Sequence, residues 1–305
     1  MASDSFTANA VQIVNRQVRP TKVAIIHGYS FGDSNSSHDE IHNALTTLFS
    51  PLNVRVFSVL ELGGAGMSDL VSSRAYDLIG LVGEADEFSS LKRASGSGFP
   101  LHKDTLDDNV PIVLSFTPRT HFKDSKKYLN FSDALVLCET TGRNWHLEVS
   151  RIVYRLFESL VVPSMLNIDL ADVKRIAKRV GFAFNLSDDD HEKIIEMLPK
   201  DCFVARSAIL HFSCKDDVRL REIYAISKSI ALKKGLADSD QLLSSHSDAK
   251  KTIRRVNVKM GIRIIGNPDE EEKETSENSM IPSADYPVAF RDEKRISMTA
   301  ILFGI

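Results

Sequence analysis

The sequence lacks the features that mark secreted, membrane-spanning, zinc-binding or nucleic-acid-binding proteins. No apolar run reaches the roughly 18 residues that a membrane-spanning helix needs, and Met1–Ser5 begins no signal peptide. The three cysteines, Cys138, Cys202 and Cys214, form no CxxC pair, so we expect neither a disulfide framework nor a zinc site. A net charge of only −3 gives no basic surface for nucleic acid. We therefore expect a soluble, cytoplasmic protein.

The first half of the chain alternates short apolar segments with helical ones. Strands are predicted at 22–27, 54–59, 76–82, 110–116 and 133–138, and a helix at 38–49. The segments are apolar almost throughout, which indicates strands buried on both faces of a parallel α/β sheet. In such sheets, ligands bind at the carboxyl ends of the strands.

A wide apolar stripe in the middle of the chain predicts a long, largely buried helix over Asn144–Leu160, which ends before Pro163. A shorter helix is predicted next, and Gly181 is expected to end it. The inner face of this second helix is expected to consist of Val173, Ile176, Ala177 and Val180.

The last third predicts a mixture of strands and helices. A strand is expected at 208–212 and a helix at 218–232. Two later segments, Arg255–Ile265 and Arg295–Ile305, alternate apolar and polar residues, which is typical of an antiparallel sheet with one face on a core. We expect a solvated hairpin loop between them at Pro268–Asn278.

Two local motifs suggest a catalytic serine and a metal-binding pair, but neighbouring features of the sequence argue against both. Gly28-Tyr29-Ser30-Phe31-Gly32 fits the G-x-S-x-G pattern of a hydrolase whose nucleophile would be Ser30, with His211 as a possible base. Only one strand precedes it, however, and a polar loop follows. His38 and His42 have the i, i+4 spacing of a metal-binding pair, but no third ligand is evident, so we interpret them as a solvated helix face.

Glycines gather after the predicted strands, although the sequence contains no Walker A motif. Glycine lets backbone amides approach and cradle a phosphate. The candidate phosphate-binding residues are Gly28, Gly32 and Asn35 after the first strand, Gly63, Gly64 and Gly66 after the second, and Gly83 after the third. Glu84, Asp86 and Glu87 follow Gly83 and would repel a phosphate unless a cation lay between them.

The most specific segment is Pro163–Lys174, which contains two aspartates three residues apart. Asp169 is placed to cap the predicted helix and Asp172 lies in its first turn, so both carboxylates are presented at one helix start. The residues alone leave two interpretations open, because both aspartates also suit the positive end of the helix dipole.

This segment closely resembles the synergy loop of the FtsZ/tubulin superfamily. The segments that follow, Arg175–Phe184, Ala208–Ile230 and Arg295–Ile305, resemble later elements of that family in the same order. The resemblance covers roughly residues 145–305. In the first half, Gly28–Ser36 and Leu62–Leu70 resemble two of the family's nucleotide-binding loops.

Two positions in the first half depart from the family. Its GGGTGTG-type phosphate signature is replaced by Gly83–Phe88, and Glu139-Thr140 stands where the family has a base-reading asparagine. The nucleotide-binding half therefore looks contracted and degenerate.

The resemblance implies an N-terminal Rossmann-like parallel sheet over 1–143, a central helix over 144–160 and a C-terminal α+β domain with a mixed or antiparallel sheet over 161–305. It implies a filament-forming protein of cell division that binds GTP or GDP, with Mg²⁺ as an accompanying ion. Asp169 and Asp172 would be the catalytic pair, supported by Asn167, and would act on a nucleotide held by the next subunit of a head-to-tail polymer. No resident metal site is expected.

The eroded phosphate signature favours an alternative, a non-hydrolysing paralogue that assembles alone or on an FtsZ filament. The expected partners are a second copy of the chain, another FtsZ and a membrane-tethering adaptor, at the division site. The sequence stops inside a predicted strand, so we expect no direct membrane binding.

Overall fold

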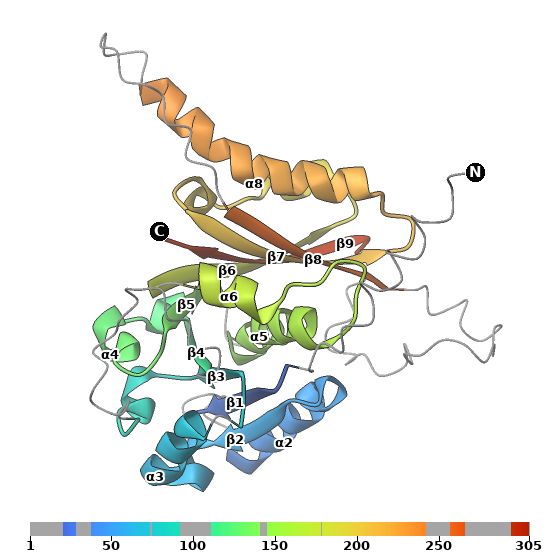
Figure 1. Ribbon diagram of the computed structural model, residues 1–305. Helices are drawn as coiled ribbons and strands as arrows, with labels where there is room; N and C mark the ends of the chain where they lie inside the picture. The colour runs from blue at the N-terminus through green and yellow to red at the C-terminus, as the bar shows by residue number, and fades with distance from the viewer. Residues whose placement is uncertain are drawn as a thin grey trace, which may run out of the picture.

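The structure is a computed structural model that describes residues 21–28, 38–73, 75–91, 111–140, 145–177, 179–241, 257–265 and 294–304. Within these residues, nine strands form one sheet in the order β2-β1-β3-β4-β5-β6-β9-β7-β8. Helices pack on both faces of the sheet (Figure 1). Within the same residues, no helix combines the length and the apolar character that crossing a membrane requires.

The first six strands run parallel to one another, as the apolar segments predict. They are β1 (Val23–His27), β2 (Arg55–Ser58), β3 (Leu78–Val82), β4 (Ile112–Pro118), β5 (Ala134–Cys138) and β6 (Arg179–Asp188). The chain passes from β1 to β2 on one side and then crosses back to β3 on the other side. The carboxyl ends of β1 and β3 therefore flank a topological switch point.

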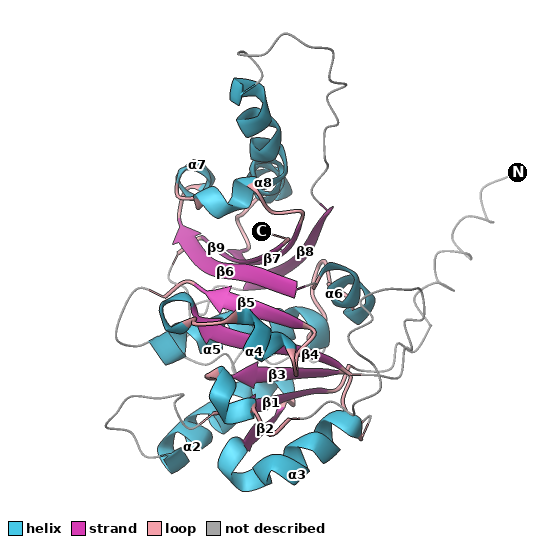
Figure 2. Cartoon of the chain, turned by 90° about the vertical axis from the view of Figure 1, so that its left-hand side faces the viewer, coloured by secondary structure: helices cyan, strands magenta, loops and turns pink. Residues whose placement is uncertain are grey.

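Two layers of helices cover the N-terminal part of the sheet (Figure 2). On one face lie α2 (His38–Phe49), the 3-10 helix η1 (Ser50–Leu52) and the long helix α5 (Trp145–Val161), which share a core with the strands. On the other face lie α3 (Val59–Ser72), the 3-10 helix η2 (Ala85–Phe88) and α4 (Ser125–Leu129). The short η3 (Arg119–His121) follows β4.

The helix α5 confirms the predicted long buried helix and joins the two halves of the chain. It contacts β4 and β5 on the N-terminal side and β7 and β9 on the C-terminal side. Its apolar residues Ile152, Val153 and Leu156 are buried in the same core as strand residues of both halves.

The C-terminal strands belong to a mixed sheet, one of the two predicted arrangements, but their order differs from the one we expected. The last strand, β9 (Ile296–Phe303), lies between β6 and β7 (Ser207–Lys215) and is antiparallel to both. The edge strand β8 (Asn257–Ile265) pairs with β7 in parallel, so the predicted antiparallel pairing of the two alternating segments is wrong. Residues 268–278, the predicted hairpin loop, lie outside the described residues.

The alternation in β9 misleads because its polar residues are small enough to be buried. All eight residues of the strand are buried. Ser297 and Thr299 occupy the expected polar face, and the Thr299 hydroxyl donates a hydrogen bond to Asn185 Oδ1 at 2.6 Å. A strand with both faces buried and one face hydrogen-bonded fits the middle of a sheet.

The remaining helices are α6 (Leu170–Ile176), on the same face as α5, and α7 (His191–Glu196), η4 (Lys200–Phe203) and α8 (Leu220–Gln241), which are associated with the opposite face. The second predicted helix ends earlier than expected, at Ala177, and both Val180 and Gly181 belong to β6. Gly181 is used for packing, because a Cβ there would lie 2.7 Å from the Phe303 ring.

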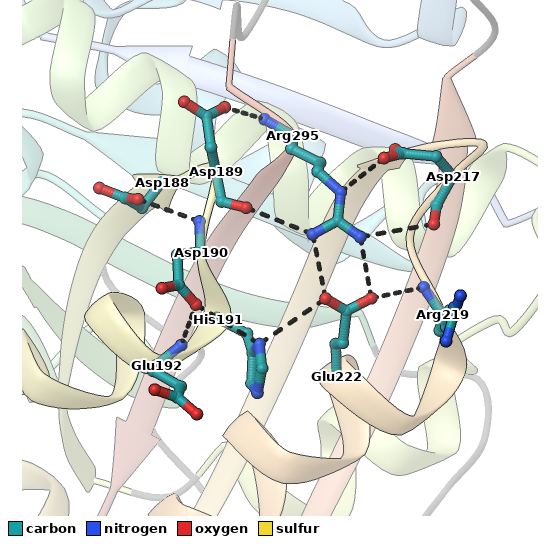
Figure 3. A network of polar contacts seen from close by, with 9 residues as sticks. All are labelled: Asp188, Asp189, Asp190, His191, Glu192, Asp217, Arg219, Glu222 and Arg295. Atoms are coloured by element: carbon teal, nitrogen blue, oxygen red, sulfur yellow. Dashed lines mark hydrogen bonds and ion pairs between the residues drawn. The ribbon is translucent and has the colours of Figure 1, made fainter.

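A charged network ties three segments together at one end of β6, β7 and β9 (Figure 3). Arg295 donates to both carboxylate oxygens of Glu222 at 3.0 Å and to Asp217 Oδ2 at 2.6 Å. It also donates to the Asp189 carbonyl at 3.3 Å. Hydrogen bonds to Glu222 hold its pKa at about 2. The larger effect comes from Arg295 and the next from the backbone N–H of Arg219.

Candidate functional site

The carboxyl ends of β1 and β3 form the candidate site, because open α/β sheets bind ligands at such a switch point. Gly28 directly follows β1 and Gly83 directly follows β3. The Gly28 N–H donates to the Val82 carbonyl at 2.8 Å and the Gly83 N–H donates to the Phe116 carbonyl at 3.3 Å. The two glycines therefore extend the strand ladder past the ends of β1 and β3.

A protein carboxylate already lies against both glycines. Glu87, in η2, is only 6% exposed, and its Oε2 accepts a hydrogen bond from the Glu84 N–H at 2.7 Å. A Cβ placed on Gly28 would overlap the Glu87 carboxylate, and one on Gly83 would lie 2.5 Å from its Oε2. Gly83 also has a φ of +150°, which side chains strain to adopt. The glycines make room for Glu87.

The other two acidic residues of this segment lie at the same edge and are paired. Glu84 lies 3.9 Å from His121 Nδ1 and 4.0 Å from Lys123 Nζ. Asp86 Oδ1 lies 2.7 Å from Lys127 Nζ. The hydrogen bond and the charge of Lys127 lower the Asp86 pKa. The basic side chains that flank this edge are therefore engaged with the protein's own carboxylates.

The second group of predicted glycines lies within α3, where we expected a loop, and their role in phosphate binding stays a prediction. Ser58 caps α3, its hydroxyl accepting from the Glu61 N–H at 3.0 Å, so the helix begins before the glycines. Gly63, with a φ of +58°, interrupts the helix. A Cβ on Gly64 would lie 2.8 Å from Ser90 Cβ, whereas Gly66 meets only its own helix, at Leu62.

Three predicted residues, Ser30, Gly32 and Asn35, lie outside the described residues. His42 does not point only to solvent as we predicted, because its Nδ1 lies 3.1 Å from Nε2 of the buried His27, at the end of β1. The side chain of His38 lies outside what the structure describes. Among the residues that the structure describes, no group of three or more His, Cys, Asp or Glu side chains is arranged to hold a metal ion.

His211 lies far across the sheet from β1, the strand that precedes the G-x-S-x-G motif. It lies on β7, and five strands separate β7 from β1 in the sheet. Its Nε2 lies 3.1 Å from Glu158 Oε2 and 3.3 Å from Ser213 Oγ. A catalytic triad places the serine and the carboxylate on different ring nitrogens. Here Glu158 and Ser213 both lie near Nε2 of His211, so these three residues do not have the geometry of a catalytic triad.

The contacts of His211 belong to a buried ionic cluster that joins α5 to β7 and β8. Glu158 Oε2 lies 3.1 Å from Arg155 Nη1, and Glu158 Oε1 contacts Arg263. Burial raises the Glu158 pKa, but His211 and the two arginines outweigh it and the net shift is downward. Burial lowers the His211 pKa. The cluster therefore surrounds the buried Glu158 carboxylate with His211 and two arginines.

The predicted catalytic residues come together at the start of α6. Asp169 is the N-cap, and its Oδ1 accepts from the Asp172 N–H at 2.6 Å. Asp172 Oδ1 lies 2.7 Å from Lys259 Nζ on β8. Asn167 Oδ1 accepts from the Ser164 N–H at 2.9 Å and from the Ser164 hydroxyl, which closes the turn before the helix.

These residues and the glycines lie at opposite ends of the parallel strands. The helix α6 leads into β6, which is parallel to β5, so Asp169 and Asp172 lie at the amino ends of the strands. Gly28 and Gly83 follow carboxyl ends. The strand β1 has five residues, which at about 3.3 Å per residue separates the edges by roughly 17 Å. The two sets cannot meet within one molecule.

The sequence reasoning missed the role of Glu87 and the partner of Asp172. One signal for the first is the spacing Glu84-x-x-Glu87 directly after Gly83, which is the spacing of a capping box. It predicts that Glu87 folds back onto the backbone at the strand end. No signal pointed to Lys259, which lies 87 residues beyond Asp172 in the sequence.

No family model and no curated protein sequence matches this chain. Solved structures do match it. An FtsZ dimer from M. jannaschii matches at a TM-score of 0.55 and 10% identity, over 98% of this chain and 92% of that one. A tryptophan-to-tyrosine mutant of the M. jannaschii FtsZ matches at 0.53 and 11%, over 98% and 96%. This chain has the FtsZ/tubulin fold.

The sequence resemblance implies a guanine nucleotide, yet the described residues of the carboxyl edge do not fit its phosphates. The space against Gly28 and Gly83 holds the Glu87 carboxylate. Glu84 and Asp86 follow Gly83 in the same segment and carry the same sign of charge as a phosphate.

Proposed function

We propose that this protein assembles head to tail into filaments and that it does so without hydrolysing GTP. The observation that carries the proposal is that large apolar side chains are exposed at both ends of the parallel strands. At the amino edge, Met165 is 58% exposed and Leu166 is 44% exposed, in the loop before Asp169. At the carboxyl edge, Leu60 at the start of α3 is 64% exposed and Leu147 at the start of α5 is 48% exposed.

Two different surfaces at opposite ends favour a filament over a closed dimer. Exposed apolar side chains are stabilised when a partner covers them. If the amino surface of one copy covers the carboxyl surface of the next, each new subunit presents the same free surface again, and a contact of this kind continues as an open polymer. The FtsZ fold supports this arrangement.

The position of Glu87 against Gly28 and Gly83 supports assembly without hydrolysis. Glu87 lies where phosphates would approach Gly28 and Gly83. In the synergy-like loop, Asp172 is paired with Lys259. Asp169, the N-cap of α6, is exposed to solvent. We infer that Asp169, with Met165 and Leu166, serves as a contact surface for the next subunit.

A role in cell division rests on the resemblance of the sequence to FtsZ. It predicts that a fluorescent fusion of the full chain gathers at the division site of growing cells. A fusion that stays evenly distributed while cells divide normally without the protein would contradict this role and leave the filament proposal standing.

Sedimentation velocity over a range of protein concentrations tests self-assembly, with and without GTP. We expect large species to form as concentration rises, to the same extent in both conditions, with no phosphate released. Met165→Lys should abolish them, because a lysine cannot be buried against an apolar surface at low cost. Met197→Lys is the matched control, since Met197 is also exposed, at 44%, but lies at the end of α7 on a face of the sheet.

Two results would contradict the proposal. Sedimentation as a monomer at all concentrations would exclude a filament of this chain alone. Assembly that needs GTP and releases phosphate would show a working GTPase polymer instead. If large species form only when FtsZ filaments are added, the chain is an accessory of FtsZ, which is the partner the resemblance implies.

A further inference from the structure

We propose that the Glu87 carboxylate takes the place of a nucleotide phosphate at the carboxyl ends of β1 and β3, so that the protein closes this place with its own side chain. The inference goes beyond filament assembly, because it concerns a single folded subunit and holds whether or not subunits associate.

The first support is the position of the carboxylate. It is nearly buried and lies against the backbone of Gly28 and Gly83, the residues that end the two strands at the switch point. The Gly28 and Gly83 N–H groups donate to strand carbonyls. The Glu84 N–H, which faces the same place, donates to Glu87 Oε2 at 2.7 Å. An anionic oxygen thus already lies where the fold would place a ligand.

The second support is the way the surrounding segment is built. Glu84 and Glu87 form a reciprocal capping box around η2, which fixes the Glu87 side chain in this direction. Beyond η2, Ser90 packs against the backbone of Gly64 on α3. Gly28, Gly83 and Gly64 are therefore each close to atoms of this one segment.

The third support is the charge at this edge. His121 and Lys123 lie near Glu84, and Lys127 is hydrogen-bonded to Asp86. These basic groups, which would otherwise attract a phosphate, are paired with carboxylates of the protein. A nucleotide would have to displace Glu87 and also compete for these partners, so its binding is opposed both sterically and electrostatically.

The edge carries a natural optical probe. Trp145 is the only tryptophan of the chain. Its ring lies 5.1 Å from the His121 ring, centroid to centroid, and His121 in turn lies 3.9 Å from Glu84. An anion that entered the place of Glu87 would change the surroundings of His121, so the fluorescence of Trp145 reports on binding.

The experiment compares wild type, Glu87→Ala and Asp86→Ala by thermal unfolding in pyrophosphate and in sodium chloride of matched ionic strength. Asp86→Ala is the matched control, because it removes one carboxylate from the same segment and releases Lys127 but leaves Glu87 in its position. We expect no pyrophosphate-specific change in wild type or Asp86→Ala. Glu87→Ala should melt lower than wild type in sodium chloride, and pyrophosphate should raise its midpoint by about 2 °C or more. The Trp145 fluorescence should change only in that variant.

Two outcomes would overturn the proposal. One is a pyrophosphate-specific rise in wild type as large as that in Glu87→Ala, since the place would then be open. The other is a folded Glu87→Ala that responds no more than Asp86→Ala, since Glu87 would then not be what fills the place.

Two further measurements cover the case in which Glu87→Ala fails to fold. Glu87→Gln keeps the shape and an acceptor for the Glu84 N–H, and should fold and stay unresponsive to pyrophosphate; a response would contradict the steric part of the proposal. Calorimetric titration of wild type with GTP should give no heat beyond dilution, and micromolar binding would overturn the proposal. Monomeric behaviour in sedimentation would overturn the proposed function alone.

Discussion

Asp172 and Lys259 form an ion pair that joins the first turn of α6 to the edge strand β8, with 2.7 Å between Oδ1 and Nζ. The Asp172 side chain is only 16% exposed, and Arg175 Nη1 lies 3.7 Å from the same oxygen. The carboxylate therefore does more than complement the dipole of α6, because it also ties the synergy-like loop to the C-terminal part of the sheet.

The Asp172→Ala variant should lose stability through this pair. We expect the free energy of unfolding to fall by about 1 kcal/mol, the upper range for a partly exposed ion pair. Urea unfolding measures it, and the loss should shrink at high salt because salt screens exposed charges. Lys259→Ala should lose a similar amount, and the double variant no more than either single one. Losses that simply add would show that the two residues do not interact.

Asp169 allows its charge to be separated from its capping role. Asp169→Ala should cost about 0.5–2 kcal/mol, because the Asp172 N–H loses its side-chain acceptor. Asp169→Asn should keep nearly full stability, since asparagine caps helices equally well. If the charge contributes to contact with the next subunit, Asp169→Asn should still weaken assembly in sedimentation. Equal assembly by wild type and Asp169→Asn would remove the charge from the proposed contact.

The Arg295 network predicts how stability changes in acid. The Glu222 pKa lies at about 2 in the folded protein against 4.5 ordinarily, so the native state is stabilised above pH 4.5 and loses this contribution as the pH falls toward 2. Glu222→Gln should be less stable than wild type at pH 7 by about 1 kcal/mol. Urea unfolding at several pH values should show the difference vanishing in acid. The exposed Glu192→Gln is the control and should show no such trend.

The buried cluster around Glu158 should be sensitive to the loss of one partner. Glu158→Ala removes the carboxylate that lies 3.1 Å from the buried Arg155, and we expect a loss of about 3–5 kcal/mol. Adding Arg155→Met should recover part of that loss, because it removes a buried charge that has lost this contact. Chemical unfolding of both variants gives the comparison. A double variant that is less stable than Glu158→Ala would mean that Arg155 is satisfied without Glu158.

Gly181 should tolerate no side chain. A Cβ there would lie 2.7 Å from the Phe303 ring and 2.8 Å from the Leu302 carbonyl oxygen, so Gly181→Ala should cost about 1–3 kcal/mol through overpacking. Gly66→Ala is the control, because it adds a Cβ with only Leu62 nearby, at 3.5 Å. In a helix this change should instead stabilise the protein by about 0.5–1 kcal/mol. Thermal unfolding that ranks the two variants in the opposite order would contradict this.

Much of the architecture could be predicted because it depends on local patterns. The apolar segments that become β1, β3, β4 and β5 predicted a parallel sheet, and the apolar stripe on 144–160 predicted the long helix α5. The capping residue Asp169 was predicted from its position alone. Each of these follows from side-chain burial or from hydrogen bonds between residues close in sequence.

The errors have a common physical origin. The alternation of β9 predicted an exposed face, but Thr299 is buried because Asn185, on a strand far away in the sequence, accepts its hydrogen bond. The glycines of α3 predicted a loop, but Ser58 caps a helix there and Gly64 admits Ser90. A sequence pattern that spans about ten residues does not show which residues from distant segments will pack against it.

The sequence by itself determined the order and type of most elements, the resemblance to the FtsZ/tubulin superfamily and the grouping of Asn167, Asp169 and Asp172 at one helix start. Only the tertiary structure decided that Lys259 pairs with Asp172 and that Glu87 lies against Gly28 and Gly83. The reason is physical: periodicity and capping depend on neighbours along the chain, whereas these contacts depend on how the fold brings residues from distant segments together.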